Sequence, residues 1–164
     1  MGLSGDFDEL DRLIGKLEDI RAKRLQAQMS RALAEEAIEL VHQGFDDEAD
    51  PFGNEWAPLK SRDGRALQKD GHLLSSFHVV RSGPDGFAIG SNERWVHVHQ
   101  YGATIRPKGK KWLRFVMNGE VVFRKQVVIP ARPMLPGANE LPPAWDAAFQ
   151  ETATELLEAH MGKK

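Results

Sequence analysis

The sequence predicts an α+β fold, in which an antiparallel sheet of two or more hairpins is packed by a long N-terminal helix and a C-terminal helix. Apolar residues recur at steps of three and four near both ends of the chain, which is the period of an amphipathic helix. Between these ends, short apolar runs are separated by Gly, Pro, Asn and Asp, which is typical of hairpins. Helices that flank a block of strands favour an antiparallel α+β arrangement over alternating βαβ units.

The composition is that of an ordinary globular protein. The chain has 164 residues, of which 41% are hydrophobic and 28% charged, with a net charge of −2 and no cysteine. This length suits one domain, and the lack of cysteine excludes disulfides and thiolate metal sites. We expect a single domain over residues 1–164, with five parts: a helical segment 1–44, a long loop 45–69, β hairpins 70–128, a Pro-rich arm 129–141 and a helix 142–160.

The first helix should begin near Phe7, because Asp6 and Glu9 have the spacing of a helix N-cap and its acidic partner. The apolar positions with helical spacing are Leu10, Leu13, Ile14, Leu17, Ile20, Ala34, Ala37, Ile38 and Val41. Charged residues at 21–24 interrupt this pattern, so either one long helix or two helices with a break is compatible with it. Gly44 is a natural residue to follow the helix.

Residues 45–69 are rich in acidic residues, Pro and Gly, with isolated aromatic residues and no sustained period. We expect a long ordered loop here. Its anchors in the core are predicted to be Phe52, Trp56 and Leu59.

Two runs, 73–81 and 87–91, flank the segment Ser82-Gly83-Pro84-Asp85-Gly86, whose residues favour a tight reversal. These runs predict a hairpin. Residues 94–100 fit the period of neither a helix nor a strand, so this segment could be either.

A second hairpin is predicted from Trp112–Met117 and Glu120–Val128, because the Asn118-Gly119 pair between them favours a type I′ turn. Near the end of the chain, Pro142 and Pro143 suit the first turn of a helix. The apolar face of that helix is formed by Trp145, Ala148, Phe149, Thr152, Leu156 and Ala159.

The segment 129–137 contains three prolines, which fix φ and remove backbone donors, so it should run as a stiff extended arm outside any sheet interior. A stiff arm that carries apolar side chains loses little entropy on docking to a partner. Equally, the same side chains could complete the core of their own subunit. The candidate interface residues are Ile129, Pro130, Arg132, Pro133, Met134 and Leu135.

One segment is strongly basic, since no acidic residue occurs between Glu93 and Glu120. Its cations are Arg106, Lys108, Lys110, Lys111 and Arg114. The segment could be a solvated loop, it could contact a phosphate backbone in a DNA-binding module, or it could meet the acidic residues 46–50 of a neighbouring copy.

No catalytic or cofactor motif is recognisable: the serine elbow, the phosphate-binding glycine loops and HExxH are all missing from the sequence. His97 and His99 would share one face of a strand, which leaves a metal-dependent enzyme as a third hypothesis. Packed or surface histidines are the simpler interpretation. We therefore expect no enzyme activity, no metal and no cofactor.

Several short signatures occur in a fixed order along the chain. They are PFGxxWxPL at 51–59, a Gly-x-Leu segment at 71–73, Ile89-Gly90 as a turn, HQYG at 99–102 and IPARPMLPG at 129–137. Together they resemble the phage virion-morphogenesis family, which includes tail-completion proteins. The resemblance spans roughly residues 40 to 160 and leaves the stretch before Ser30 outside it.

This resemblance implies a structural protein of the head–tail junction or of the tail end, which acts through a homo-oligomeric ring, often sixfold, and through docking to other tail or neck proteins. It implies no catalytic residue. The matching positions would act as loop anchors (Trp56, Pro58, Leu59), shape a turn (His99, Gln100, Gly102) and set the arm (Pro130, Arg132, Pro133). Met134-Leu135 stand where the family pattern suggests a bulky residue such as phenylalanine. The resemblance therefore does not identify the docking partner of the arm.

The resemblance also places the protein in the host cytoplasm during assembly and then in the virion. The first residues carry neither a basic region nor an apolar one, and no apolar run approaches the roughly 20 residues of a membrane span. We expect no secretion and no membrane partner.

Overall fold

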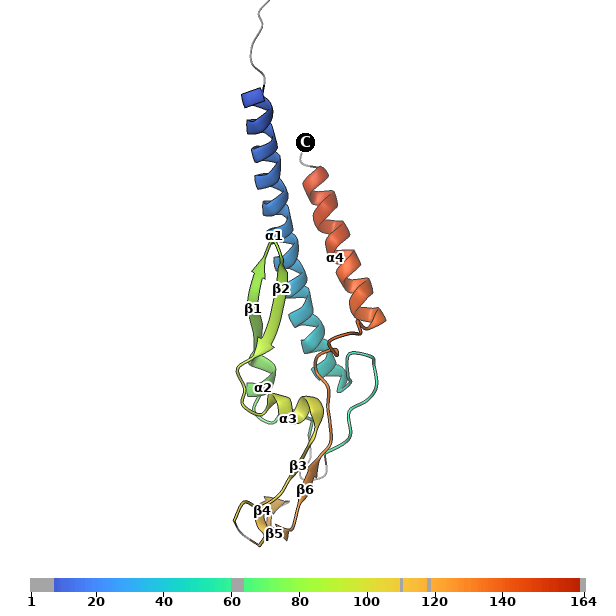
Figure 1. Ribbon diagram of the computed structural model, residues 1–164. Helices are drawn as coiled ribbons and strands as arrows, with labels where there is room; N and C mark the ends of the chain where they lie inside the picture. The colour runs from blue at the N-terminus through green and yellow to red at the C-terminus, as the bar shows by residue number, and fades with distance from the viewer. Residues whose placement is uncertain (1–7, 60–63, 110, 118, 163–164) are drawn as a thin grey trace, which may run out of the picture.

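The computed structural model describes residues 8–59, 64–109, 111–117 and 119–162. It confirms the α+β class, with a long N-terminal helix, a C-terminal helix and small antiparallel sheets between them (Figure 1). The helices are α1 (Asp8–Asp47), α2 (His72–Ser75), α3 (Val96–Tyr101) and α4 (Pro143–Met161). The strands are β1 (Phe77–Gly83), β2 (Gly86–Ser91), β3 (Ala103–Ile105), β4 (Leu113–Met117), β5 (Glu120–Arg124) and β6 (Val127–Ile129).

From Asp8 to Asp47 the chain is one continuous helix, so the charged residues at 21–24 do not break it. The predicted cap at Asp6 and start at Phe7 lie outside the described residues. The helix passes Gly44 and ends at Asp47, three residues later than expected. Glu48 takes the left-handed conformation instead, with φ of 52°, while Ala49 N donates to Gly44 O at 3.0 Å. Together with a bond from Glu48 N to Phe45 O, this is a Schellman ending, in which Glu48 replaces the usual glycine.

The core lies where the second half of α1 meets the loop, the first hairpin, the arm and α4. Phe45 is fully buried at its centre and makes edge contacts with Trp56 and Phe77, at ring-centroid distances of 5.3 and 6.0 Å. Trp145 of α4 belongs to the same cluster and stacks edge-on with Phe149 at 6.0 Å. Edge-to-face aromatic packing of this kind adds to the stabilisation that comes from burial alone. One cluster therefore joins segments from both ends of the chain.

The first predicted hairpin is present as β1 and β2, which pair from Phe77–Ser91 to Gly83–Gly86. Its first strand begins later than expected, because residues 73–75 form the short helix α2 and Leu73 uses that turn to reach the core. Ile89-Gly90 lies inside β2 and not in a turn. The hairpin packs along α1 (Figure 1).

The second predicted hairpin is present as β4 and β5, paired from Leu113–Arg124 to Met117–Glu120. Gly119 has φ of 82°, as the predicted turn requires, whereas Asn118 lies outside the described residues. The expected second strand does not run to Val128. It stops at Arg124, and β6 follows as a separate strand that pairs with β3. The strands thus form three separate two-stranded ladders.

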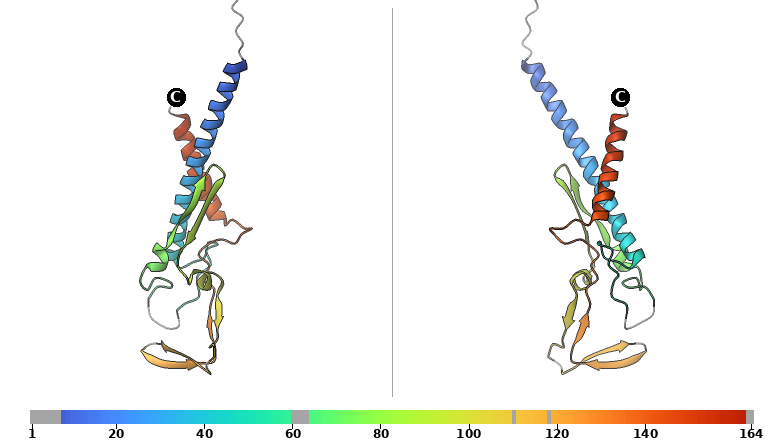
Figure 2. Two further views of the ribbon diagram at one scale, coloured as in Figure 1. Left: turned by 60° about the vertical axis from the view of Figure 1, so that its left-hand side comes forward. Right: turned by 90° about the vertical axis from the view of Figure 1, so that its right-hand side faces the viewer.

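The molecule is elongated, with its core in the middle and different elements at its two ends. The first half of α1 rises beyond the turn of β1–β2 and beyond the end of α4 (Figure 1). At the opposite end, the β4–β5 hairpin lies crosswise to the long axis (Figure 2). Towards their outer ends α1 and α4 diverge, as both views of Figure 2 show. Each end of the molecule is therefore built from elements that extend away from the core.

Candidate functional site

The proline-rich arm is held by a set of backbone hydrogen bonds that begins with Arg132. This residue is only 5% exposed. Its Nε and Nη2 donate to Ala57 O at 2.8 and 2.6 Å, and Nη2 also donates to Pro58 O at 3.2 Å. Burial lowers the pKa of Arg132, while the carboxylate of Glu48 acts in the opposite direction. The planar guanidinium therefore joins the arm to the loop that precedes residue 60.

Two further side chains fix the arm from other elements. The indole Nε1 of Trp56 donates to Pro133 O at 2.9 Å. The amide of Gln100, at the end of α3, bonds the arm in both directions: Oε1 accepts from Met134 N at 2.8 Å and Leu135 N at 3.1 Å, and Nε2 donates to Leu135 O at 2.7 Å. A proline-rich segment lacks partners within a sheet, and these side chains satisfy its backbone instead.

Gly102 brings α3 and β3 close to the arm. It has φ of 72° and ψ of 166°, a region that is essentially restricted to glycine. A Cβ at this position would lie 2.9 Å from Ala131 N and 3.0 Å from Ile129 O. Beside it, Arg132 N donates to His99 O at 2.7 Å. We call the set formed by Trp56, Gln100, Gly102 and Arg132 the arm clamp.

Two roles were predicted for the arm: docking to a partner, and completion of the core of its own subunit. The burial of its side chains is relevant to both. Met134 is 3% exposed and belongs to the core cluster, and the half-buried Leu135 packs against that cluster. Ile129 forms the end of β6 and is half-buried. In this structure the apolar side chains of the arm therefore contact their own subunit, and Met134 and Arg132 are not accessible to a partner.

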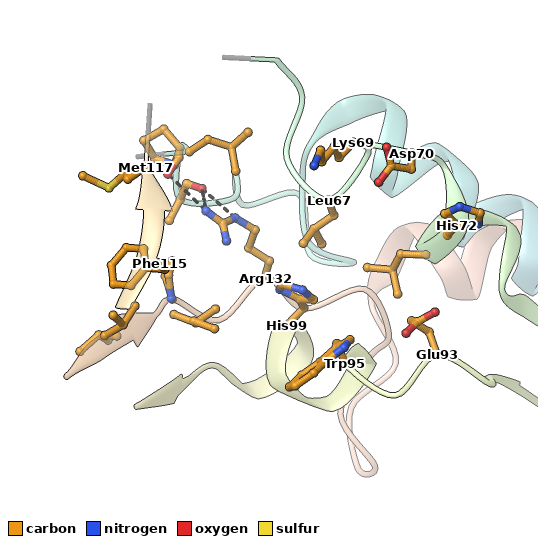
Figure 3. A pocket seen from close by; sticks show the side chains of 18 of the residues that line it. Leu67, Lys69, Asp70, His72, Glu93, Trp95, His99, Phe115, Met117 and Arg132 are labelled. Carbon is orange, nitrogen blue, oxygen red and sulfur yellow. Dashed lines mark hydrogen bonds between the residues drawn. The ribbon is translucent and has the colours of Figure 1, made fainter. Parts of the chain in front are cut away.

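A cavity of about 900 Å³ lies beside the arm clamp, between the loop, α3 and the β4–β5 hairpin (Figure 3). Its ionisable lining comes from separate segments. These residues are Lys69, Asp70 and His72 before β1, Glu93 and His99 around α3, Arg124 on β5 and Arg132 on the arm. Phe115 and Met117 of β4 form an apolar wall. Arg132 points to the loop carbonyls and donates hydrogen bonds to them through Nε and Nη2, as the dashed lines in Figure 3 show. Among the described residues, no three His, Asp or Glu side chains are placed to hold a metal ion.

The two histidines of the metal hypothesis do not form a pair. They lie on helix α3, where residues two apart point to different faces, and His97 is exposed. The expectation that His97 and His99 share one face of a strand is therefore wrong. Burial, and then the positive charge of Arg132, lower the pKa of His99 from 6.5, so its ring is neutral at pH 7. His99 Nδ1 is buried and has no hydrogen-bond partner in the described part of the chain.

The basic segment is exposed at Arg106, Lys108, Lys111 and Arg114, whereas Lys110 lies outside the described residues. Lys125 adds a further cation, with its Nζ 5.5 Å from the centroid of the Trp112 ring. The acidic residues proposed to meet this segment are partly engaged within the subunit. Asp46 pairs with Arg65 at 3.4 Å, and Asp50 Oδ1 accepts from Phe52 N and Asn54 N at 2.9 Å.

The loop anchors are only partly those expected. Trp56 is 7% exposed in the core, and Leu59 packs against it half-buried. Phe52 is 43% exposed, so its prediction as a core anchor is wrong. The carboxylate of Asp50 closes the turn around Phe52, and this local bonding holds the loop without a buried ring.

The geometry defines a small α+β protein whose sequence signatures serve mainly to hold its own backbone together. The phage virion morphogenesis family matches residues 6–159, which is nearly the whole chain, and the protein belongs to this family. The match includes the N-terminal helix, so the expectation that the stretch before Ser30 lies outside the family is wrong. Family membership indicates a structural, virion-associated role. No curated protein and no solved structure matches the chain.

No helix in the described part of the chain is both long enough and apolar enough to cross a bilayer.

Proposed function

We propose that the protein is a structural subunit of the phage head–tail junction or tail end, which assembles into a closed ring, of six copies by resemblance, and docks there to other tail or neck proteins. The family membership supports a role in virion assembly. In this proposal the protein converts no substrate. The arm clamp keeps the subunit rigid, and the two ends of the elongated molecule make the contacts.

The observation that carries this proposal is the exposure of apolar side chains at both ends, away from the core. On α1, Leu17 and Ile20 are 58% and 64% exposed. On the β4–β5 hairpin, Val116, Val121 and Phe123 are 63%, 47% and 53% exposed. Apolar groups gathered on one surface mark an interaction site in a protein that works among partners. A subunit with a contact surface at each end is suited to link neighbours in an assembly.

The oligomeric state of the purified full chain tests the proposal. Gel filtration with light scattering should give a discrete mass of several copies, which rises from a smaller species as the concentration increases. Negative-stain images of the assembled fraction should show rings. A chain that remains a monomer at every concentration, both alone and with purified tail-tube or neck proteins, would contradict the proposal.

DNA binding by the basic end is the second candidate, supported by the exposed cations of the β4–β5 region. Lys108→Ala with Lys111→Ala should then weaken binding to any DNA sequence and flatten its dependence on salt, because each phosphate contact releases a counterion. Fluorescence anisotropy with a labelled duplex measures both effects. Arg81→Ala, which removes an exposed cation on β1, is the control. If the wild-type chain binds no DNA at low salt, this candidate is excluded.

A further inference from the structure

The first half of α1 carries an apolar stripe that none of the described residues of its own subunit covers. Its members Leu13, Ile14, Leu17 and Ile20 are 54%, 44%, 58% and 64% exposed. The helix continues into the core only further along, where Ala34, Ala37 and Val41 are buried. In Figure 1 this half of the helix extends past the first hairpin and past α4. The stripe is therefore a surface available to another molecule.

The position of the stripe on the helix follows from the helical turn. At about 100° per residue, Leu13, Ile14, Leu17 and Ile20 lie within an arc of about 120°. Leu13, Leu17 and Ile20 follow the alternating spacing of four and three residues that packs one helix along another. Arg21 and Arg24 fall on the same arc beyond Ile20, so the stripe ends there. It offers about two turns of apolar contact to a helix that lies alongside.

The charges that flank the stripe differ in sign between its two sides. Glu18 and Asp11 lie about 100° and 120° from the centre of the stripe on one side. Lys16 and Lys23 lie about 100° and 120° from it on the other side. Among the described residues, the ion pairs found are Arg31–Glu35 and Arg65–Asp46, so none of these four side chains is neutralised within the subunit.

From this arrangement we propose that the stripe is covered by the same stripe of neighbouring copies, with the N-terminal helices parallel. When parallel helices pack around a common axis, the acidic flank of each one faces the basic flank of the next. Antiparallel packing would instead place Lys16 and Lys23 against the same lysines, which is repulsive. The charge pattern thus selects copies that point in the same direction, as cyclic symmetry requires. This inference rests on the proposed self-assembly and adds the surface that drives it.

Charge reversal in the full chain tests the pairing of the flanks. Lys16→Glu with Lys23→Glu makes both flanks acidic, and Asp11→Lys with Glu18→Lys makes both basic. Each double variant should raise the dissociation constant of self-association by about tenfold, because attraction between copies becomes repulsion at every contact. Sedimentation equilibrium measures the constant, and circular dichroism checks that the variants remain folded. Asp19→Lys, on the face opposite the stripe, should leave the constant unchanged.

Mixing the two double variants provides the rescue. Acidic and basic copies can then alternate, so an equimolar mixture should associate about as tightly as the wild type. If either double variant associates as tightly as the wild type, or if the mixture does not recover, this inference is overturned while the proposed assembly stands. If the wild type itself never associates, the proposed assembly fails first. Loss of co-assembly with a tail protein, without a change in self-association, would assign the stripe to that protein and overturn the inference.

Discussion

At the scale of single residues, Arg132 is a buried cation that forms no ion pair with any described acidic residue. Its guanidinium is bound by two backbone carbonyls of the loop, Ala57 O and Pro58 O. Backbone carbonyls accept hydrogen bonds from a charged donor strongly, and they cannot rotate away as a side chain can. The arm and the loop are therefore held at a fixed distance.

Removal of this guanidinium should destabilise the subunit. Arg132→Met keeps most of the apolar stem but leaves both carbonyls without their donor, so the free energy of unfolding should fall by roughly 2–4 kcal/mol. Urea denaturation followed by tryptophan fluorescence measures it. Arg31→Met, which breaks the exposed pair with Glu35, is the control and should cost less than about 0.5 kcal/mol. Equal losses for the two variants would mean that the arm clamp contributes little.

His99 predicts a dependence of stability on pH. Because its pKa is lowered in the folded chain, the unfolded chain takes up the proton first, near pH 6.5. The contribution of His99 is therefore complete above this pH and is lost as the pH falls. His99→Gln should flatten the decrease in unfolding free energy between pH 7.5 and about pH 5.5. His97→Gln changes an exposed position of the same helix and serves as the control; a slope unchanged in His99→Gln would contradict the assignment.

At the scale of elements, the junction between α3, β3 and the arm depends on the absence of a side chain at Gly102. Gly102→Ala combines a strained backbone conformation with a contact to the rigid backbone of Ala131, and should lower the free energy of unfolding by roughly 3 kcal/mol or more. Gly109→Ala also adds a Cβ at a positive φ, 73°, but into open space, so it measures the cost of a positive φ without a close contact, at about 1 kcal/mol. Thermal unfolding of the two variants separates the two effects. Equal shifts in Tm would show that the backbone of Ala131 moves to accommodate the new methyl group.

The elements that were predictable from the sequence are those with local signals. The heptad-like spacing of α1, the Asn-Gly turn of the second hairpin and the prolines that begin α4 each depend on residues within one element. The split of the expected last strand into β5 and β6 was not predictable, because β6 is defined by its pairing with β3, more than twenty residues earlier. Residues 94–100 lacked a clear period because α3 buries little more than Val98.

The same distinction applies to the candidate site. The signatures identified Trp56, Gln100 and Arg132 as important, but not what they contact, since their partners lie between 34 and 77 residues away in the chain. Phe52 was misassigned because an aromatic residue in a loop is compatible with burial or exposure. The structure distinguishes the two through the Phe52 side chain, which is 43% exposed.

At the scale of the whole molecule, stability should be unequal along the long axis. The second half of α1 is part of the core, whereas its first half and the β4–β5 hairpin extend away from the core. Amide hydrogen exchange of the dissociated chain should therefore be slowest in residues 34–45 and faster in residues 11–20 and 113–124. Assembly should slow exchange in residues 11–20. Uniform protection along α1 in the dissociated chain would contradict this gradient.

The core that joins Phe45 to Trp145 has a consequence for the order of events on the ribosome. At about 5–20 residues per second, synthesis of α1 is complete roughly 5–20 s before Trp145 is added. During that interval the nascent helix has neither its arm nor α4 to cover its inner face. Polysomes that carry several such chains bring these uncovered helices close together, so incomplete subunits expose apolar surface to one another until each core is complete.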